Sequence, residues 1–120
     1  MASINLETIK YLEDLNTENG SDVVAEVIGV FLETASKNIQ KLKAAHHTKN
    51  QQEVRELSHL MKSSFWAVGA QTLVQMMDDI EASASKTNFQ FDSMSIQAIE
   101  KEFKQACDEL LVIKNQREKK

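Results

Sequence analysis

The chain has 120 residues, enough to bury one hydrophobic core and too few for two. Hydrophobic residues make up 42% and charged residues 27%, a balance typical of a soluble globular domain and not of a disordered chain. The absence of proline and the presence of only three glycines argue against an all-β fold, which needs turn residues at short intervals. We therefore expect one all-α domain over residues 1–120.

The formal net charge is −4, the wrong sign for a protein that would bind the phosphates of DNA or RNA, so we expect no nucleic-acid partner. The single cysteine, Cys107, cannot form an internal disulfide, and the Cys, His and carboxylate residues do not have the spacing of a zinc site. The N-terminus shows no basic region followed by an apolar stretch, and no segment reaches the roughly 18 apolar residues of a membrane span. These features predict a cytoplasmic protein with no membrane segment and no zinc site.

The spacing of apolar residues predicts a short helix near the N-terminus, followed by a long one. Residues 4–15 carry an apolar side chain at every third position and precede the polar stretch 16–20. Ser21 is expected to cap the second helix, which an apolar stripe continues to about Ala45. Residues 47–50 then turn the chain. The apolar positions of the first helix are Leu6, Ile9, Leu12 and Leu15.

Two further helices follow in the middle of the chain. Asn50, with Glu53 three residues later, resembles a capping box and is expected to start the third helix. Gly69 provides a break before the fourth helix. The residues expected to face the core from these two helices are Val54, Leu57, Met61, Ser64 or Phe65, Val68, Leu73, Met76, Met77 and Ile80.

The C-terminal part of the chain predicts a loop and a last helix. Residues 83–92 form a short polar stretch that is expected to be the loop. Phe89 and Phe91 within it are expected to fold back onto the other helices. Apolar residues in alternating steps of three and four then mark a helix over residues 96–113. The charged residues 115–120 are expected to fray.

Four amphipathic helices joined by short connections favour an antiparallel up-down four-helix bundle, here with an additional short N-terminal helix. The bundle core is expected to cover about residues 21–114. Because such a bundle hosts many functions, function has to be argued from a site.

His59 is the strongest candidate for such a site. On a helical wheel of about 100° per residue it lies roughly 170° from the centre of the core stripe of the third helix, so it should face solvent. Arg55, Lys62 and Ser63 lie one turn away on the same face. Spacing alone leaves an ordinary solvated face open, because an exposed histidine near lysine and arginine is common on helix surfaces.

An exposed imidazole is substantially neutral near pH 7 and has a nitrogen lone pair available for nucleophilic attack. The neighbouring cations favour that neutral form and would meet the oxygens of an incoming phosphoryl group. Glu56, three residues before His59, is placed to accept a hydrogen bond from the other ring nitrogen and to fix the tautomer.

Trp66, the only tryptophan, falls on the same face about two turns after His59. An exposed large aromatic side chain often marks a docking surface, but Trp66 near the helix end can equally pack beneath the turn at Gly69. The adjacent His46 and His47 do not converge on one ion and are read as a solvated helix end. Cys107 is read as a small packing residue.

Residues 57–70 read Leu-Ser-His-Leu-Met-Lys-Ser-Ser-Phe-Trp-Ala-Val-Gly-Ala and are followed by Leu73. This string resembles the signature of histidine-containing phosphotransfer (HPt) domains: a small residue, His, any residue, an apolar residue, Lys, Gly or Ser, a small residue, and later a Gly-Ala pair and Leu. Residues 30–42 resemble the preceding helix of that family and residues 80–81 the end of its fourth helix. The resemblance covers about residues 21–84.

The resemblance implies that His59 accepts a phosphoryl group from an aspartyl phosphate on a receiver domain, of a response regulator or a hybrid sensor kinase, and donates it to another receiver. Lys62 would steady the phosphoryl oxygens. The receiver would supply Mg²⁺, and the chain would have no metal or other cofactor of its own. It would therefore be a phosphotransfer intermediate and not an enzyme, and a monomer is expected. The residues expected to contact the partner are Arg55, Glu56, Ser63 and Trp66.

The sequence departs from the family pattern at two places. Ser63 stands where many members have glycine, in a Lys-Ser-Ser variant similar to that of the quorum-sensing phosphorelay branch. Phe65 and Trp66 are bulkier than the residues usual after the motif, which bears on how a partner packs there. Two alternatives are an adaptor that docks a receiver or kinase through the same face without transferring phosphate, and a structural bundle with an incidental histidine.

Overall fold

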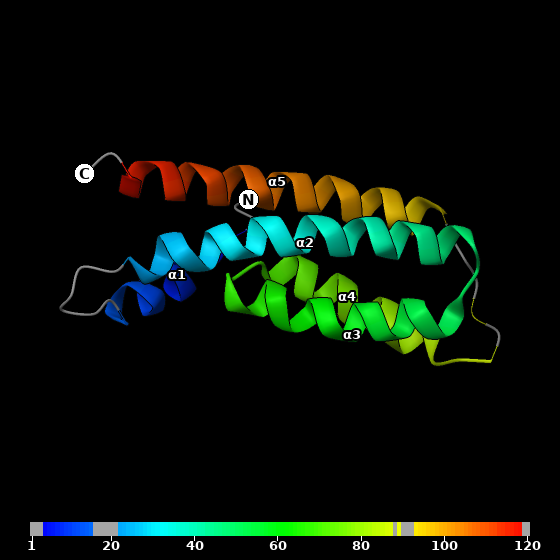
Figure 1. The fold of residues 1–120 in the computed structure, drawn as a ribbon. Coiled ribbons are helices and arrows are strands. Elements are labelled where there is room, and N and C mark those ends of the chain that lie inside the picture. Colours follow the sequence, from blue (N-terminus) through cyan, green and yellow to red (C-terminus); the bar gives the residue numbers. More distant parts are fainter. Residues whose placement is uncertain (1–3, 16–21, 88, 90–92, 119–120) are drawn as a thin grey trace.

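The computed structural model of the protein describes residues 4–15, 22–87, 89 and 93–118. All regular secondary structure in these residues is α-helical, in the order α1 (Leu6–Asp14), α2 (Val23–His47), α3 (Gln51–Ala67), α4 (Gln71–Ala84) and α5 (Ser93–Glu118). The four long helices run antiparallel to their neighbours in the chain, and α1 packs beside the start of α2 (Figure 1). The predicted up-down four-helix bundle with a short N-terminal helix is confirmed.

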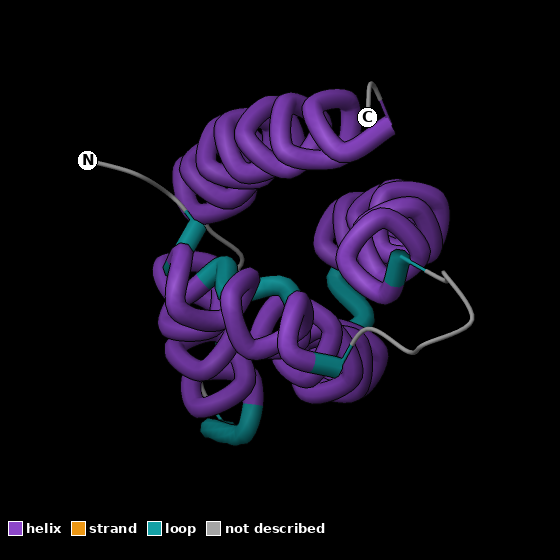
Figure 2. Tube along the Cα trace, turned by 90° about the vertical axis from the view of Figure 1, so that its left-hand side faces the viewer, coloured by secondary structure: helices purple, strands orange, loops and turns teal. Residues whose placement is uncertain are grey.

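The long helices are seen close to end-on in Figure 2. Their apolar side chains form one common core. Phe31 of α2, Phe65 of α3 and Phe103 of α5 meet there, with ring centroids 5.8, 6.2 and 6.3 Å apart. Of the two alternatives for the core stripe of α3, Phe65 is fully buried and Ser64 only partly. This three-helix aromatic contact fixes the rotation of α3 and therefore which residues its opposite face presents to solvent.

Asparagine and aspartate side chains cap the first turns of α2 and α3. Asp22 Oδ1 accepts the N–H of Ala25 at 3.2 Å, so Asp22 is the cap of α2, whereas Ser21 lies outside the described residues. The predicted cap of α3 is confirmed, because Asn50 Oδ1 accepts the N–H of Glu53 at 3.1 Å. The amide of Asn50 also donates to Glu53 Oε2 at 3.2 Å.

Gly69 forms the tight turn between α3 and α4, with a φ of 77° in the left-handed region. Its carbonyl accepts the N–H of Asn5 at 2.8 Å. A Cβ atom at this position would lie 2.8 Å from Thr8 Cβ and 2.9 Å from the Asn5 carbonyl oxygen. Only glycine therefore allows this turn and the close approach of the residues that begin α1.

The C-terminal helix is longer than expected, and the predicted fraying is wrong for residues 115–118, which continue α5. Arg117 explains the difference. Its Nε donates to both carboxylate oxygens of Asp22 at 2.8 Å, and its Nη1 donates to Glu13 at 3.0 Å. The end of α5 is thereby tied to α2 and α1. Residues 119–120 lie outside the described part of the chain.

Other helix positions also differ from the prediction. The predicted apolar face of α1 is wrong at Leu6 and Leu15, which are 66% and 47% exposed, because steps of three drift around a helix of 3.6 residues per turn. Helix α4 continues to Ala84, inside the predicted loop. Phe89 packs against the core as expected, whereas Phe91 lies outside the described residues.

Three minor predictions have mixed outcomes. Met77 is buried and Met76 is partly buried against the core, as expected. Cys107 also packs against the core, and burial followed by the Asp108 charge raises its pKa to about 11. The prediction that both histidines at the end of α2 are solvated is wrong for His46, which is partly buried. His47 is exposed, as predicted.

Candidate functional site

His59 projects from the middle of α3 with 71% of its side chain exposed, which confirms the predicted orientation. The opposite side of the helix is held in the core by Val54, Met61 and Phe65. Ser58, directly before the histidine, is also fully buried, and its Oγ donates to the Val54 carbonyl at 2.6 Å. The small side chain at this position satisfies its own hydroxyl locally and lets α3 pack closely against its neighbours.

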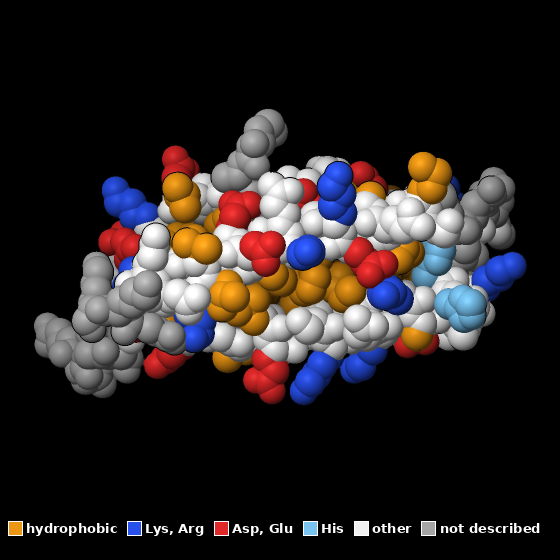
Figure 3. Space-filling model, turned by 90° about the horizontal axis from the view of Figure 1, so that it is seen from above, with side chains coloured by type: hydrophobic (Ala, Val, Ile, Leu, Met, Phe, Trp, Pro, Cys, Tyr) orange, Lys and Arg blue, Asp and Glu red, His pale blue; other side chains and the backbone are white. Residues whose placement is uncertain are grey.

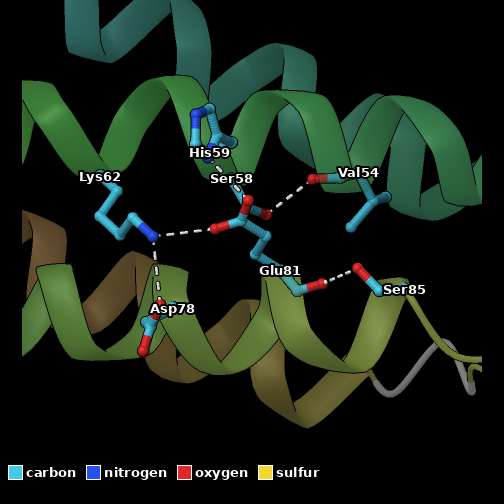
Figure 4. Close-up of polar contacts among 7 residues, drawn as sticks. All are labelled: Val54, Ser58, His59, Lys62, Asp78, Glu81 and Ser85. Carbon is cyan, nitrogen blue, oxygen red and sulfur yellow. Dashed lines mark hydrogen bonds and ion pairs between the residues drawn. The ribbon is translucent and has the colours of Figure 1, made fainter.

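The ring of His59 is held by a residue from the neighbouring helix α4. Its Nδ1 lies 2.7 Å from Glu81 Oε2 (Figure 4). The expected ring contact with Glu56 is not made: Glu56 accepts a hydrogen bond from Gln52 Nε2 at 3.1 Å along the exposed side of α3. Glu81 takes this place because α4 packs against α3, so that its side chain faces the ring across the helix interface.

Lys62 joins the same cluster. Its Nζ donates to Glu81 Oε1 at 2.9 Å and to Asp78 Oδ1 at 3.1 Å. Glu81 therefore binds His59 with one carboxylate oxygen and Lys62 with the other (Figure 4). Within the described residues, these four side chains form a continuous polar network between α3 and α4.

The contacts fix the charges of the network. The hydrogen bond from Lys62 lowers the pKa of Glu81, with partial burial opposing and His59 assisting. The hydrogen bond to Glu81, followed by that to Asp78, raises the pKa of Lys62. Near pH 7 the carboxylate is thus ionised and the ammonium is charged.

These charges also determine the tautomer of the histidine. An ionised carboxylate only accepts hydrogen bonds, so Nδ1 of His59 must carry the proton that lies between it and Glu81. The lone pair is then on Nε2, which points away from α4 (Figure 4). In the neutral ring the site therefore presents a preoriented Nε2 lone pair with a lysine ammonium nearby, an arrangement able to take up and release an electrophilic group.

A family model for the Hpt domain matches residues 26–111. The chain belongs to the Hpt domain family. Hpt domains are phosphotransfer carriers, not classical enzymes, so the protein has a role in histidine phosphotransfer within a phosphorelay, and Hpt domains interact with receiver domains. The match confirms the HPt resemblance and extends it into α5. Searches of curated proteins and of solved structures gave no significant match.

Trp66 of this Hpt domain is exposed, with 66% of its surface accessible. The alternative in which it packs beneath the turn at Gly69 is therefore wrong. Together with Lys62, Ser63 and Val74 it borders a shallow hollow between α3 and α4. Its use as a docking residue stays a prediction. Because its neighbour Phe65 is a core residue, only one of the two bulky side chains after the motif is exposed.

The remaining site residues predicted from the Hpt motif are exposed on the same helix. Arg55 lies one turn before His59 and has no hydrogen bond or ion pair within the described residues; it lines a shallow hollow beside the end of α4. Ser63 and Glu56 are also exposed. The structure thus leaves all of these side chains accessible around the histidine.

Two features are absent from the described part of the Hpt domain. No group of His, Cys, Asp and Glu there could hold a metal ion, and none of its helices is long and apolar enough to cross a membrane. The side formed by α2 and α5 carries charges of both signs beside hydrophobic side chains (Figure 3). That face lacks the single-signed basic stripe of a nucleic-acid surface.

Glu81 and Asp78 were not predicted as site residues. Their spacing of three places them on one face of α4, which is all that the sequence reveals. Which face of α4 meets the histidine depends on the Gly69 turn and on core packing. The sequence signal for a partner of this kind was the HPt signature around His59. A histidine that acts as a nucleophile needs a hydrogen-bond partner for its second ring nitrogen, but the signature does not say which residue provides it.

Proposed function

We propose that His59 is the phosphorylated residue of this Hpt domain, and that it accepts a phosphoryl group from an aspartyl phosphate on one receiver domain and passes it to another. The observation that carries this proposal is the bond between His59 Nδ1 and Glu81, which makes Nε2 the nucleophilic nitrogen of the neutral ring on an exposed face. The receivers would belong to response regulators or hybrid sensor kinases. We further propose that the protein acts as a cytoplasmic monomer.

In the transfer step, the lone pair of His59 Nε2 attacks the phosphorus atom and forms the N–P bond. The P–O bond to the receiver's aspartate breaks, and its electron pair leaves with the carboxylate. The ring then carries a positive charge that it shares with Nδ1–H, and the ionised Glu81 stabilises that charge through its hydrogen bond. Attack by the carboxylate of the second receiver reverses these changes and regenerates the neutral ring.

Cations near the ring offset the charge on the phosphoryl oxygens. Lys62 is one of these cations, and two of its three N–H donors bind carboxylates of α4. Arg55 supplies a second cation on the same face, and the receiver would bring Mg²⁺ with its own carboxylates. The exposed side chains of Glu56, Ser63 and Trp66 would contact the receiver surface around the reacting atoms.

The test is transfer from a receiver of the same organism, phosphorylated by a kinase or by acetyl phosphate, to the purified chain. Phosphate-affinity electrophoresis before and after acid treatment reports phosphohistidine, which is acid-labile. We expect an acid-labile shift for the native chain and for His47→Gln, which alters an exposed histidine at the end of α2, and none for His59→Gln. A labelled His59→Gln protein would refute the assignment.

A second function, a docking adaptor that transfers no phosphate, is favoured by the exposure of Trp66 beside the hollow at Ser63 and Val74. It predicts receiver binding that Trp66→Ala weakens and that phosphorylation does not change. Binding of an unphosphorylated receiver, together with no label from any receiver, would favour the adaptor over the carrier.

A further inference from the structure

Lys62 binds two carboxylates of α4. Its Nζ lies 2.9 Å from Glu81 Oε1 and 3.1 Å from Asp78 Oδ1, both on α4 (Figure 4). A phosphoryl group on His59 Nε2 would lie on the other side, because this nitrogen points away from α4. The ammonium must therefore move away from at least one carboxylate to meet the phosphoryl oxygens.

The two carboxylates are not equivalent. Glu81 is 24% exposed and also binds His59, so its contact keeps the ammonium beside the ring. Asp78 lies almost one turn earlier on α4, is 59% exposed, and within the described residues contacts only Lys62 by a polar interaction. The contact with Asp78 is longer and more exposed to solvent, so it is the weaker one and draws the ammonium along α4 away from the ring.

The charges in the site point the same way. A phosphoryl group brings close to two negative charges next to two ionised carboxylates, and like charges at short range disfavour each other. Lys62 is the cation that can offset this repulsion, and Asp78 takes up part of its charge. The two carboxylates therefore make the phosphorylated form less stable than it would be with only the ring and Lys62 present.

We propose that Asp78 is a positioning residue that holds Lys62 back from the phosphoryl group and so keeps phosphorylated His59 a strong phosphoryl donor. The proposal rests on the function proposed above. In the equilibrium with a receiver, the N–P bond of the histidine forms as the acyl P–O bond breaks, and the electron pair goes to the receiver's carboxylate. Asp78 would shift this balance toward the receiver.

The experiment compares Asp78→Asn with Asp79→Asn. Both substitutions remove one negative charge from an exposed position on α4. The side chain of Asp79, however, accepts a hydrogen bond from Gln75 Nε2 at 2.9 Å and makes no contact with Lys62. The difference between the two variants thus isolates the contact with the lysine from the general change in charge.

Each variant is brought to equilibrium with the same phosphorylated receiver, and the phosphohistidine fraction is measured by phosphate-affinity electrophoresis and phosphorus NMR. We expect Asp78→Asn to raise the equilibrium constant for phosphohistidine about two- to fivefold over Asp79→Asn, the range of a partly exposed ion pair. Asp78→Glu, which keeps the charge, should stay near the native value. In a Lys62→Met background the two asparagine variants should be equal.

A rise for Asp78→Asn no larger than that for Asp79→Asn, or a fall, would overturn the role of Asp78. The two levels of the account fail differently. If the native chain takes up no phosphoryl group at all, the proposed function of His59 is wrong; if the native chain is phosphorylated and the two asparagine variants agree, only the role of Asp78 is wrong.

Discussion

Replacing Gly69 by alanine tests the turn that sets α4 against α3. The added Cβ would lie 2.8 Å from Thr8 Cβ and 2.9 Å from the backbone carbonyl of Asn5, closer than packed atoms come. The left-handed φ of 77° costs a non-glycine residue about 1–2 kcal/mol. The overlap costs about 1–3 kcal/mol more, because one of the two neighbours is backbone and cannot rotate away.

Together these terms predict a loss of about 3 kcal/mol, which for a domain of this size lowers Tm by about 12 °C. The measurement is thermal unfolding followed by far-UV circular dichroism. Gly29→Ala is the matched control. Gly29 lies inside α2, and a Cβ atom there would meet only Lys114 Cε, at an ordinary contact distance of 3.6 Å. The control should gain up to about 1 kcal/mol from helix propensity. Equal Tm values for Gly69→Ala and the native chain would refute this account of the turn.

Four further predictions concern the site, the core and two titrating groups. Glu81→Gln should slow phosphoryl transfer to the histidine about tenfold or more in a rate assay, because the ring loses its carboxylate partner; an unchanged rate would contradict the proposed orientation. Phe65→Ala should lower the free energy of unfolding by about 3–5 kcal/mol in urea, and a loss below about 1 kcal/mol would show that this ring is dispensable in the core. Partial burial tends to raise the pKa of Asp22, but hydrogen bonds from Arg117 and the helix backbone more than offset it, so the pKa falls below 3.8. A lowered folded-state pKa stabilises the fold above the unfolded value, so Asp22→Asn should be less stable than the native chain at pH 7, and the difference should shrink as the pH falls below 3.8; a difference that does not change with pH would argue against the ion pair. Alkylation of Cys107 at pH 8 should be much slower in the folded chain than in urea, because burial raises its pKa to about 11, and equal rates would contradict that burial.

The exposure of His59 could be predicted because it depends on one helix alone. A regular helix places residues at fixed angles, and the core stripe of α3 is long enough to define its buried side. The same argument was least informative for Trp66, near the end of α3, where a turn can cover either side. The exposure of Trp66 depends on the path of the chain at the Gly69 turn, which the helix pattern alone does not give.

The partners of His59 and the end of α5 could not be predicted because they depend on contacts between distant segments. Glu81 follows His59 by 22 residues and reaches the ring only through the packing of α4 on α3. Arg117 meets Asp22 from 95 residues away, so the charged tail looked solvated in the sequence. Composition and periodicity determine helices and their apolar faces, whereas these polar contacts also need the rotation of each helix in the bundle.

The most direct test of the central claim is to identify the phosphorylated atom. The chain is labelled by a phosphorylated receiver and studied by phosphorus–proton NMR, which distinguishes the two nitrogens of a phosphorylated imidazole. Because Glu81 occupies the Nδ1 side of His59, we predict a phosphoryl group on Nε2 and a retained proton on Nδ1. A phosphoryl group on Nδ1, or on any residue other than His59, would contradict the account.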